Sequence, residues 1–113
     1  MREIIISFLL FTIGQLLIWF QTNSQFISDW CKEHPWVLAA CGLPISYILI
    51  KATTYVVTGF DGLLWPGRFI GFGSGIIVFA LCTWVFMGEG INSKTMISIA
   101  LSTILILIQI LWK

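Results

Sequence analysis

Charged side chains are scarce in this sequence. Among 113 residues there are six Lys or Arg and five Asp or Glu, and the formal net charge is +1. A charge so close to neutral provides no basic surface of the kind that binds nucleic acid. Hydrophobic residues make up 58% of the chain, and the mean hydropathy is +0.99. A soluble domain of this size cannot bury so much apolar surface, so the sequence predicts a protein that is solvated by lipid.

Residues that bind metals or act as nucleophiles are also few. The chain has one histidine, His34, and three cysteines, which show no Cys-x-x-Cys pair and no spacing typical of metal ligands. The acidic residues fall at the ends of apolar segments, and no Ser/His/Asp set is present. We therefore expect no enzyme activity, no metal site and no cofactor.

Four apolar runs occupy most of the chain. They cover residues 4–20, 36–57, 63–87 and 95–112. At a rise of 1.5 Å per residue, about 20 residues cross a bilayer core of about 30 Å. The first run follows Arg2, but no small-residue cleavage site comes after it, so we do not interpret it as a removable signal. We expect an all-α fold in which residues 1–113 form a single membrane domain, an integral four-transmembrane-helix bundle.

The distribution of basic residues predicts the orientation of this bundle. An even number of spans places both termini on the same side of the membrane. That side is expected to carry four basic residues and the other side two: Arg2, Lys51, Arg68 and Lys113 against Lys32 and Lys94. Because basic residues are enriched on the cytoplasmic side, we expect both termini in the cytoplasm.

Glycine and proline interrupt two of the apolar runs. Gly67, Gly71 and Gly75 recur at i, i+4 and i+8, so they line one face of a helix and allow another backbone to come close. We interpret this face as a packing surface, and Gly73 together with Gly75 as a hinge. Pro44 in the second run has no N–H to donate, and it predicts a kink there.

Several polar residues lie inside the runs. Gln15 is near the middle of the first run and shares a helix face with Trp19. Its amide either bonds to a neighbouring helix or lines a polar cavity. Tyr47, Lys51 and Tyr55 recur at i, i+4 and i+8 in the second run. The Lys51 ammonium either reaches to the membrane interface or points into a cavity.

Lys51 and Arg68 lie in two runs that a short turn joins. We expect them at similar depth on adjacent helices, where two cations repel each other unless an anion lies between them. Asp61 in the turn, a lipid phosphate and an anionic substrate are the three candidates. The predicted substrate-binding residues are Gln15, Trp19, Tyr47, Lys51, Tyr55 and Arg68.

The longest connection, residues 21–35, carries Phe26, Ile27 and Trp30 close together. These side chains suit a short helix that lies in the membrane interface. A plain connector with interfacial aromatic residues is the alternative, and the sequence does not decide between them.

Motifs in the last third of the chain resemble a known family. They are the Gly-Ser-Gly at 73–75, Trp84, and the Gly-Glu at 88–89 that precedes a short polar turn. In order and spacing they resemble the small multidrug resistance family and its relatives in the drug/metabolite transporter superfamily. The resemblance implies that this four-helix unit is half of a transporter. A homodimer would then share a cavity that three helices of each subunit line.

The chain also departs from that family in two ways. Proton-coupled members carry a glutamate in the first helix, where this chain has Gly14 and Gln15. Glutamine does not titrate, so proton-coupled export of cationic drugs is not expected, and Gly-Gln instead resembles relatives that flip lipid-linked aminosugars. In the last helix the family packs two subunits through small residues seven apart. Here Leu105 follows Ser98 at that distance, so we expect a rearranged dimer contact.

The sequence leaves two functions open. The first is a transporter or flippase of the small multidrug resistance-like type, for a small-molecule or lipid-linked substrate with an anionic or phosphate-bearing group. The second is a non-transporting accessory or oligomeric small membrane protein, for example a viral or complex-stabilising one. In either case the expected partners are the lipid bilayer and a second copy of the chain, with no nucleic acid.

Overall fold

The computed structural model describes residues 1–112, so Lys113 lies outside the described part of the chain. Within residues 1–112 every regular element is helical. The elements are α1 (Arg2–Asn23), the 3₁₀ turn η1 (Ser24–Phe26), α2 (Asp29–Glu33), α3 (Pro35–Ala40), α4 (Gly42–Gly59), α5 (Trp65–Met87) and α6 (Ser93–Leu111). Four stretches are long and apolar enough to span a membrane: Arg2–Phe26, Pro35–Gly59, Trp65–Met87 and Ser93–Leu111. The prediction of an all-α chain with four such helices is confirmed.

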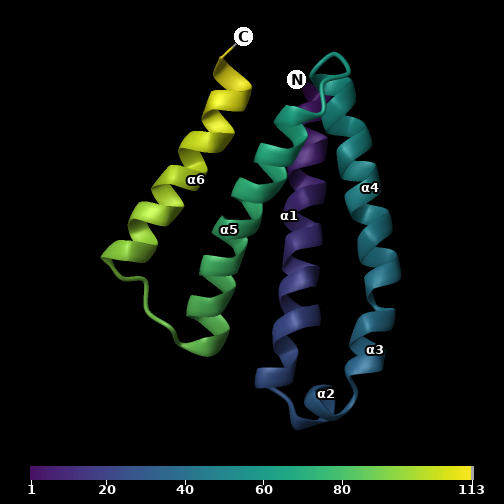
Figure 1. Ribbon diagram of the computed structural model, residues 1–113, viewed down its shortest axis with the longest axis vertical. Coiled ribbons are helices and arrows are strands. Elements are labelled where there is room, and N and C mark those ends of the chain that lie inside the picture. Colours follow the sequence, from purple (N-terminus) through teal and green to yellow (C-terminus); the bar gives the residue numbers. More distant parts are fainter. Residues whose placement is uncertain (113) are drawn as a thin grey trace.

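The long helices form a flat layer that measures 47 × 35 × 18 Å. α1 packs against both α4 and α5, and α6 packs against α5, so the order across the layer is α4, α1, α5, α6 (Figure 1). The start of α1, the α4–α5 turn and the end of α6 lie together at what we call the terminal end. α2 and the α5–α6 connection lie at the opposite end (Figure 1).

Two groups of buried side chains hold the layer together. The larger one takes residues from all four long helices, and they are Phe11, Ala52, Val56, Ile70 and Ile106. The smaller one joins α1 to the second half of α5 and consists of Trp19, Val78 and Cys82. α1 and α5 thus form the centre of the fold, with α4 and α6 at its two edges.

Glycines on α5 allow neighbouring helices to lie against its backbone. A Cβ atom at Gly73 would be 2.8 Å from Cγ1 of Ile106 and 2.9 Å from the carbonyl oxygen of Ser102, both on α6. A Cβ at Gly67 would be 2.6 Å from Cγ1 of Val56 on α4. α5 continues without interruption through residues 73–75, so the hinge stays a prediction.

The second membrane-length stretch is interrupted just before Pro44. α3 ends at Ala40 and α4 begins at Gly42, because Pro44 has no N–H to donate to the carbonyl four residues earlier. The side-chain amide of Gln21 donates a 2.9 Å hydrogen bond to the Leu38 carbonyl next to this interruption. The kink expected at Pro44 therefore takes the form of a short break, and α1 supplies a hydrogen-bond donor beside it.

Local signals explain how the other long helices begin and end. Gly88 ends α5 with a φ of 72°, a left-handed conformation that glycine adopts without strain. Asn92 precedes α6, and its side-chain oxygen accepts a 2.9 Å hydrogen bond from the Thr95 backbone N–H. At the terminal end, Asp61 and Gly62 have φ values of 57° and 88° and form the tight turn between α4 and α5.

The connection over residues 21–35 is largely helical. α1 continues to Asn23, and the short helix α2 follows at Asp29–Glu33. The Trp30 ring stacks on His34 with ring centroids 4.4 Å apart, and Phe26 and Ile27 are exposed. The exposed aromatic and aliphatic side chains are compatible with both interpretations of this segment.

Candidate functional site

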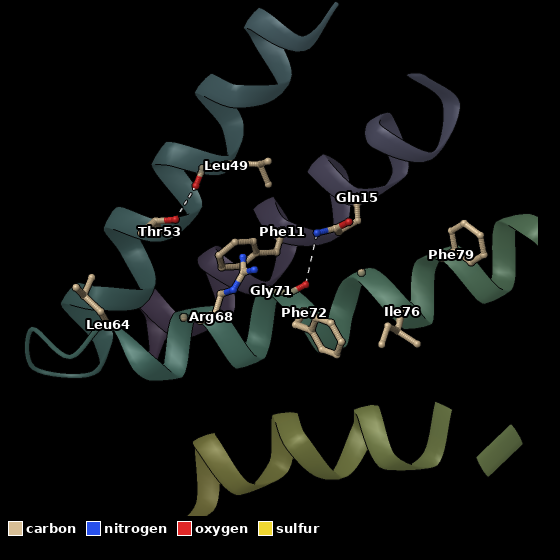
Figure 2. Close-up of a pocket in the computed structure, with 12 residues that line it drawn as sticks. Phe11, Gln15, Leu49, Thr53, Leu64, Arg68, Gly71, Phe72, Ile76 and Phe79 are labelled. Atoms are coloured by element: carbon tan, nitrogen blue, oxygen red, sulfur yellow. Dashed lines mark hydrogen bonds between the residues drawn. The ribbon is translucent and has the colours of Figure 1, made fainter. Parts of the chain in front are cut away.

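The main hollow of the molecule has a volume of about 610 Å³ and lies between α1, α4 and α5 (Figure 2). We call it the main groove. Its lining is mostly apolar or glycine, with one amide, one hydroxyl and one guanidinium: Phe11, Gln15, Leu49, Thr53, Leu64, Gly67, Arg68, Gly71, Phe72, Gly75, Ile76 and Phe79. A volume of this size is in the usual range for small-molecule sites.

The groove lies where α1 separates α4 from α5, and glycines of α5 let side chains of α1 and α4 pack onto its backbone. α4 and α5 contact each other less extensively than each contacts α1, which forms the floor between them. On α5, Gly67, Gly71 and Gly75 contribute only backbone to the lining. Phe11 from α1 fits against this glycine stripe, since a Cβ at Gly71 would be 3.2 Å from its Cε1 atom.

Gln15 is half-buried and reaches from α1 to the glycine stripe of α5. Its Nε2 atom donates a long hydrogen bond of 3.4 Å to the Gly71 carbonyl, which also accepts a 3.0 Å bond from the Ser74 hydroxyl. Within residues 1–112, the Gln15 Oε1 atom and its second amide hydrogen have no other protein partner. Gln15 therefore links two helices and also presents unused hydrogen-bonding capacity to the groove.

Arg68 is the only charged side chain that lines the main groove within the described residues. It lies one turn inside α5 at the terminal end, and Figure 2 shows its guanidinium extending from α5 toward α1. Over residues 1–112 the sole ion pair joins the N-terminal amine to Glu3 at 3.9 Å, so Asp61 does not pair with Arg68. Arg68 is exposed, and within residues 1–112 its five N–H donors have no carboxylate at ion-pairing distance.

Lys51, Tyr47 and Tyr55 do not line this groove. The Lys51 Nζ atom is 5.8 Å from the centroid of the Tyr47 ring, a cation–π distance, and all three side chains are exposed on α4. By helix rise, Lys51 lies about 12 Å from the end of α4, whereas Arg68 lies about 5 Å from the start of α5. The structure thus does not bring these two cations together in the groove.

Trp19 is also outside the groove, because α5 buries it. The side chain is only 2% exposed and packs with Val78 and Cys82. Its Nε1 atom donates a 3.0 Å hydrogen bond to the Thr83 hydroxyl, which satisfies the single donor of the indole. Trp19 shares its face of α1 with Gln15 but lies one turn farther along α1. There it contacts a part of α5 that carries side chains such as Val78 and Cys82 and no glycine.

The apolar residues that form the walls of the groove were not among the residues predicted from the sequence. Phe72, Ile76 and Phe79 lie on the same face of α5 as Arg68, at i+4, i+8 and i+11 from it. That spacing is visible in the sequence and could have identified them as partners of Arg68. Thr53 on α4 was not identified either, and its hydroxyl donates a 2.9 Å bond to the Leu49 carbonyl.

Comparison with known proteins finds no matching family model, curated protein or solved structure. The resemblance to the small multidrug resistance family stays a prediction from motifs. Within residues 1–112, no group of three or more His, Cys, Asp or Glu side chains is placed to hold a metal ion.

Proposed function

We propose that this chain is a multi-pass integral membrane protein and that it moves an anionic, phosphate-bearing lipid-type substrate along the main groove. Its four membrane-length helices would cross the bilayer with both termini in the cytoplasm. Arg2 and Arg68 lie in the first turns of helices at the terminal end and Lys51 lies about 12 Å from that end of α4, whereas Lys32 and Lys94 lie at the opposite end. This charge distribution supports the orientation, because basic residues are enriched on the cytoplasmic side.

The observation that carries the proposal is the unpaired Arg68 guanidinium in an apolar groove. No carboxylate from residues 1–112 forms an ion pair with it. Arg68 is exposed and lies one turn from the start of α5, so its guanidinium is within reach of the membrane interface, where lipid phosphate is the available anion. Guanidinium binds phosphate through two parallel hydrogen bonds, so a phosphate-bearing ligand would supply the missing partner. The same charge disfavours cationic ligands.

The shape of the groove favours a ligand with an apolar chain. From Leu64 to Phe79 it follows α5 for about 22 Å, which is longer than the ~15 Å of one leaflet's hydrocarbon. Several lining side chains, among them Leu64, Phe72 and Phe79, are more than half exposed, so the groove opens on the surface of the layer. A lipid can therefore place its headgroup at Arg68 and Gln15 while its chain remains in the groove or in the bilayer.

A lipid-flipping assay tests the proposal. The purified protein is reconstituted in vesicles that contain a fluorescent phosphatidylglycerol, and the fraction of probe reaching the other leaflet is followed by chemical quenching. We expect Arg68→Ala to slow flipping about tenfold or more, because a hydrogen bond to a charged group contributes ~1.5–3 kcal/mol. Gln15→Ala should have a smaller effect. Lys51→Ala is the matched control, because it removes a cation outside the groove.

The outcomes separate the two functions that the sequence left open. Equal flipping by the parent protein and Arg68→Ala would exclude the groove as the anion path. If the parent protein flips neither the anionic probe nor a neutral phosphatidylcholine probe, the transporter proposal fails. Copurification with a larger membrane complex would then support the accessory role.

The proposal includes a homodimer that forms through α6. α6 packs against α5 alone among the long helices, and its far side carries exposed apolar side chains: Met96, Ile97, Leu101, Ile104 and Leu107. We expect Leu101→Cys to form a disulfide-linked dimer in vesicles, and Val85→Cys on exposed α5 surface to serve as the control. Equal cross-linking at both positions would contradict a specific α6 contact.

A further inference from the structure

A second hollow of about 290 Å³ lies between the later half of α5 and the start of α6. It lies beside the α5–α6 connection, whereas Arg68 lies in the first turn of α5. Figure 1 shows this connection at the end of the molecule opposite the start of α5. Glu89 and Lys94 both line it, yet the two side chains form no ion pair with each other. The Thr83 hydroxyl lines it too and accepts the Trp19 hydrogen bond.

The second hollow and the main groove meet at two side chains of α5. Ile76 and Phe79 line both of them. On α5, Arg68, Ile76, Phe79 and Thr83 recur at helical spacing and so share one face. The two hollows therefore follow a single stripe of α5, and α5 itself is about 33 Å long, enough to cross the ~30 Å bilayer core.

We propose that the two hollows are the two halves of one substrate path, that Ile76 and Phe79 form the barrier between them, and that Lys94 receives the anionic group at the far end. This inference rests on the proposed lipid-flipping function. Within residues 1–112 each half of the path then has one cation without an ion-pair partner, Arg68 in the main groove and Lys94 in the second hollow, and only the second half also contains a carboxylate, that of Glu89.

Polar groups lie close to the barrier on both sides. Before it, the amide of Gln15 lies against Gly75, where a Cβ would be 3.0 Å from the Gln15 Oε1 atom. Beyond it, the Thr83 hydroxyl hydrogen has no acceptor within residues 1–112. By helix rise the positions 75 and 83 are about 12 Å apart, so the apolar section that a headgroup must cross is short.

The two barrier side chains differ in how easily they change rotamer. Phe79 is 53% exposed, and exposed side chains change rotamer within nanoseconds. Ile76 is half-buried and branched at Cβ, which restricts its χ1 angle. The ring of Phe79 is thus the part of the barrier that moves when a headgroup passes.

The first test enlarges the passage. In the vesicle assay we expect Phe79→Ala and Ile76→Ala to flip the fluorescent phosphatidylglycerol severalfold faster than the parent protein, and Phe79→Leu to be intermediate. Leu81→Ala is the matched control, because Leu81 is an exposed α5 residue that lines neither hollow. Parent rates in all three barrier variants, or an equal rise in Leu81→Ala, would overturn the barrier assignment.

The second test concerns the far cation. Lys94→Ala should slow flipping of the anionic probe about tenfold, as expected when a hydrogen bond to a charged group is lost, and Lys94→Arg should retain it. Lys32→Ala is the control, because Lys32 lies in α2 at the same end and lines neither hollow. An unchanged rate in Lys94→Ala would overturn the role assigned to Lys94.

A third measurement does not depend on lipid flipping. Single cysteines replace Phe72 in the main groove and Ser98 in the second hollow, in a chain in which Cys31 and Cys41 are serine. Buried Cys82 is retained. A membrane-impermeant sulfonated thiol reagent should label each new cysteine from one side of the vesicle only.

With Phe79→Ala added, each of these cysteines should be labelled from both sides. One-sided labelling that survives Phe79→Ala would overturn the single path even if the parent protein flips lipid. An absence of flipping by the parent protein would instead refute the proposed function, whatever the labelling shows.

Discussion

Gly73 offers a direct test of how α5 and α6 pack. A Cβ atom at this position would lie 2.8 Å from Cγ1 of Ile106 and 2.9 Å from the backbone carbonyl oxygen of Ser102. Non-bonded carbon atoms prefer separations of about 3.5–4.0 Å. A carbonyl oxygen in a helix cannot rotate away, so Gly73→Ala must move α6 as a whole.

Two opposing terms set the size of the effect. Overpacking of a tight contact costs about 1–3 kcal/mol, whereas alanine is favoured over glycine inside a helix by up to ~1 kcal/mol. Because one of the two close atoms at Gly73 belongs to the backbone, we expect an overpacking cost of about 2–3 kcal/mol, so Gly73→Ala should lower the free energy of unfolding by about 1–2 kcal/mol. At Gly71 the nearest atom is Cε1 of Phe11, at 3.2 Å, and an aromatic ring edge can shift by that small amount. For Gly71→Ala the small overpacking cost and the helix preference of alanine should nearly cancel, so the free energy of unfolding should stay close to that of the parent protein.

Equilibrium unfolding in mixed detergent micelles, followed by circular dichroism, measures these differences. Gly90→Ala is the control, because a Cβ there meets no atom within 4 Å. The expected order of stability is Gly90→Ala and Gly71→Ala close to the parent protein, with Gly73→Ala clearly below. A Gly73→Ala variant as stable as the parent would show that α6 does not pack on α5 in this way.

Three further predictions concern other contacts and the orientation. Thr83→Val should lower the free energy of unfolding by ~0.6–1 kcal/mol, typical of a hydrogen bond between membrane helices. Trp19→Phe should cost more, because it also removes part of a buried ring, and the double variant should show a coupling energy in the same unfolding assay. Gln21→Leu should lower the free energy of unfolding by ~1 kcal/mol, because it removes the donor to the Leu38 carbonyl. Backbone amides near Leu38 that exchange more slowly in this variant than in the parent protein would contradict the role given to Gln21. Epitope tags at both termini should be accessible to antibody only after the cell membrane is permeabilised.

The number and approximate ends of the long helices could be predicted from the sequence. Each apolar run is long enough to span a bilayer, and strong turn signals such as Gly62 and Gly88 separate the later runs. The differences arise where a run continues into polar residues. α1 extends past the apolar run to Asn23, and at its end the Ser24 backbone N–H bonds to the Phe20 carbonyl while the Asn23 side-chain amide donates to the Trp19 carbonyl at 3.1 Å.

The candidate site was harder to predict, because periodicity shows which residues share a face but not what that face meets. Gln15 and Trp19 share a face as expected, and both contact α5. Gln15 lies against Gly75 and remains half-buried at the groove, whereas Trp19 is buried among the side chains of α5. That difference depends on the register between α1 and α5, which the sequence of one helix does not contain.

The position of Lys51 has the same explanation. Ala52 and Val56 are fully buried in the core that α4 shares with α1 and α5. Lys51 and Tyr47 lie on a different face, which is exposed. Tyr47 and Lys51 lie on one face of α4, as their spacing predicts, but this face does not line the groove that contains Arg68.

The most direct measurement of the central claim compares two single-charge variants in the same vesicles. Arg68→Ala and Lys51→Ala each remove one cation from the chain, but only Arg68 lines the main groove. We predict that flipping of fluorescent phosphatidylglycerol falls about tenfold or more in Arg68→Ala and stays at the parent rate in Lys51→Ala. Equal rates in the two variants, or the larger loss in Lys51→Ala, would contradict an anion path through this groove.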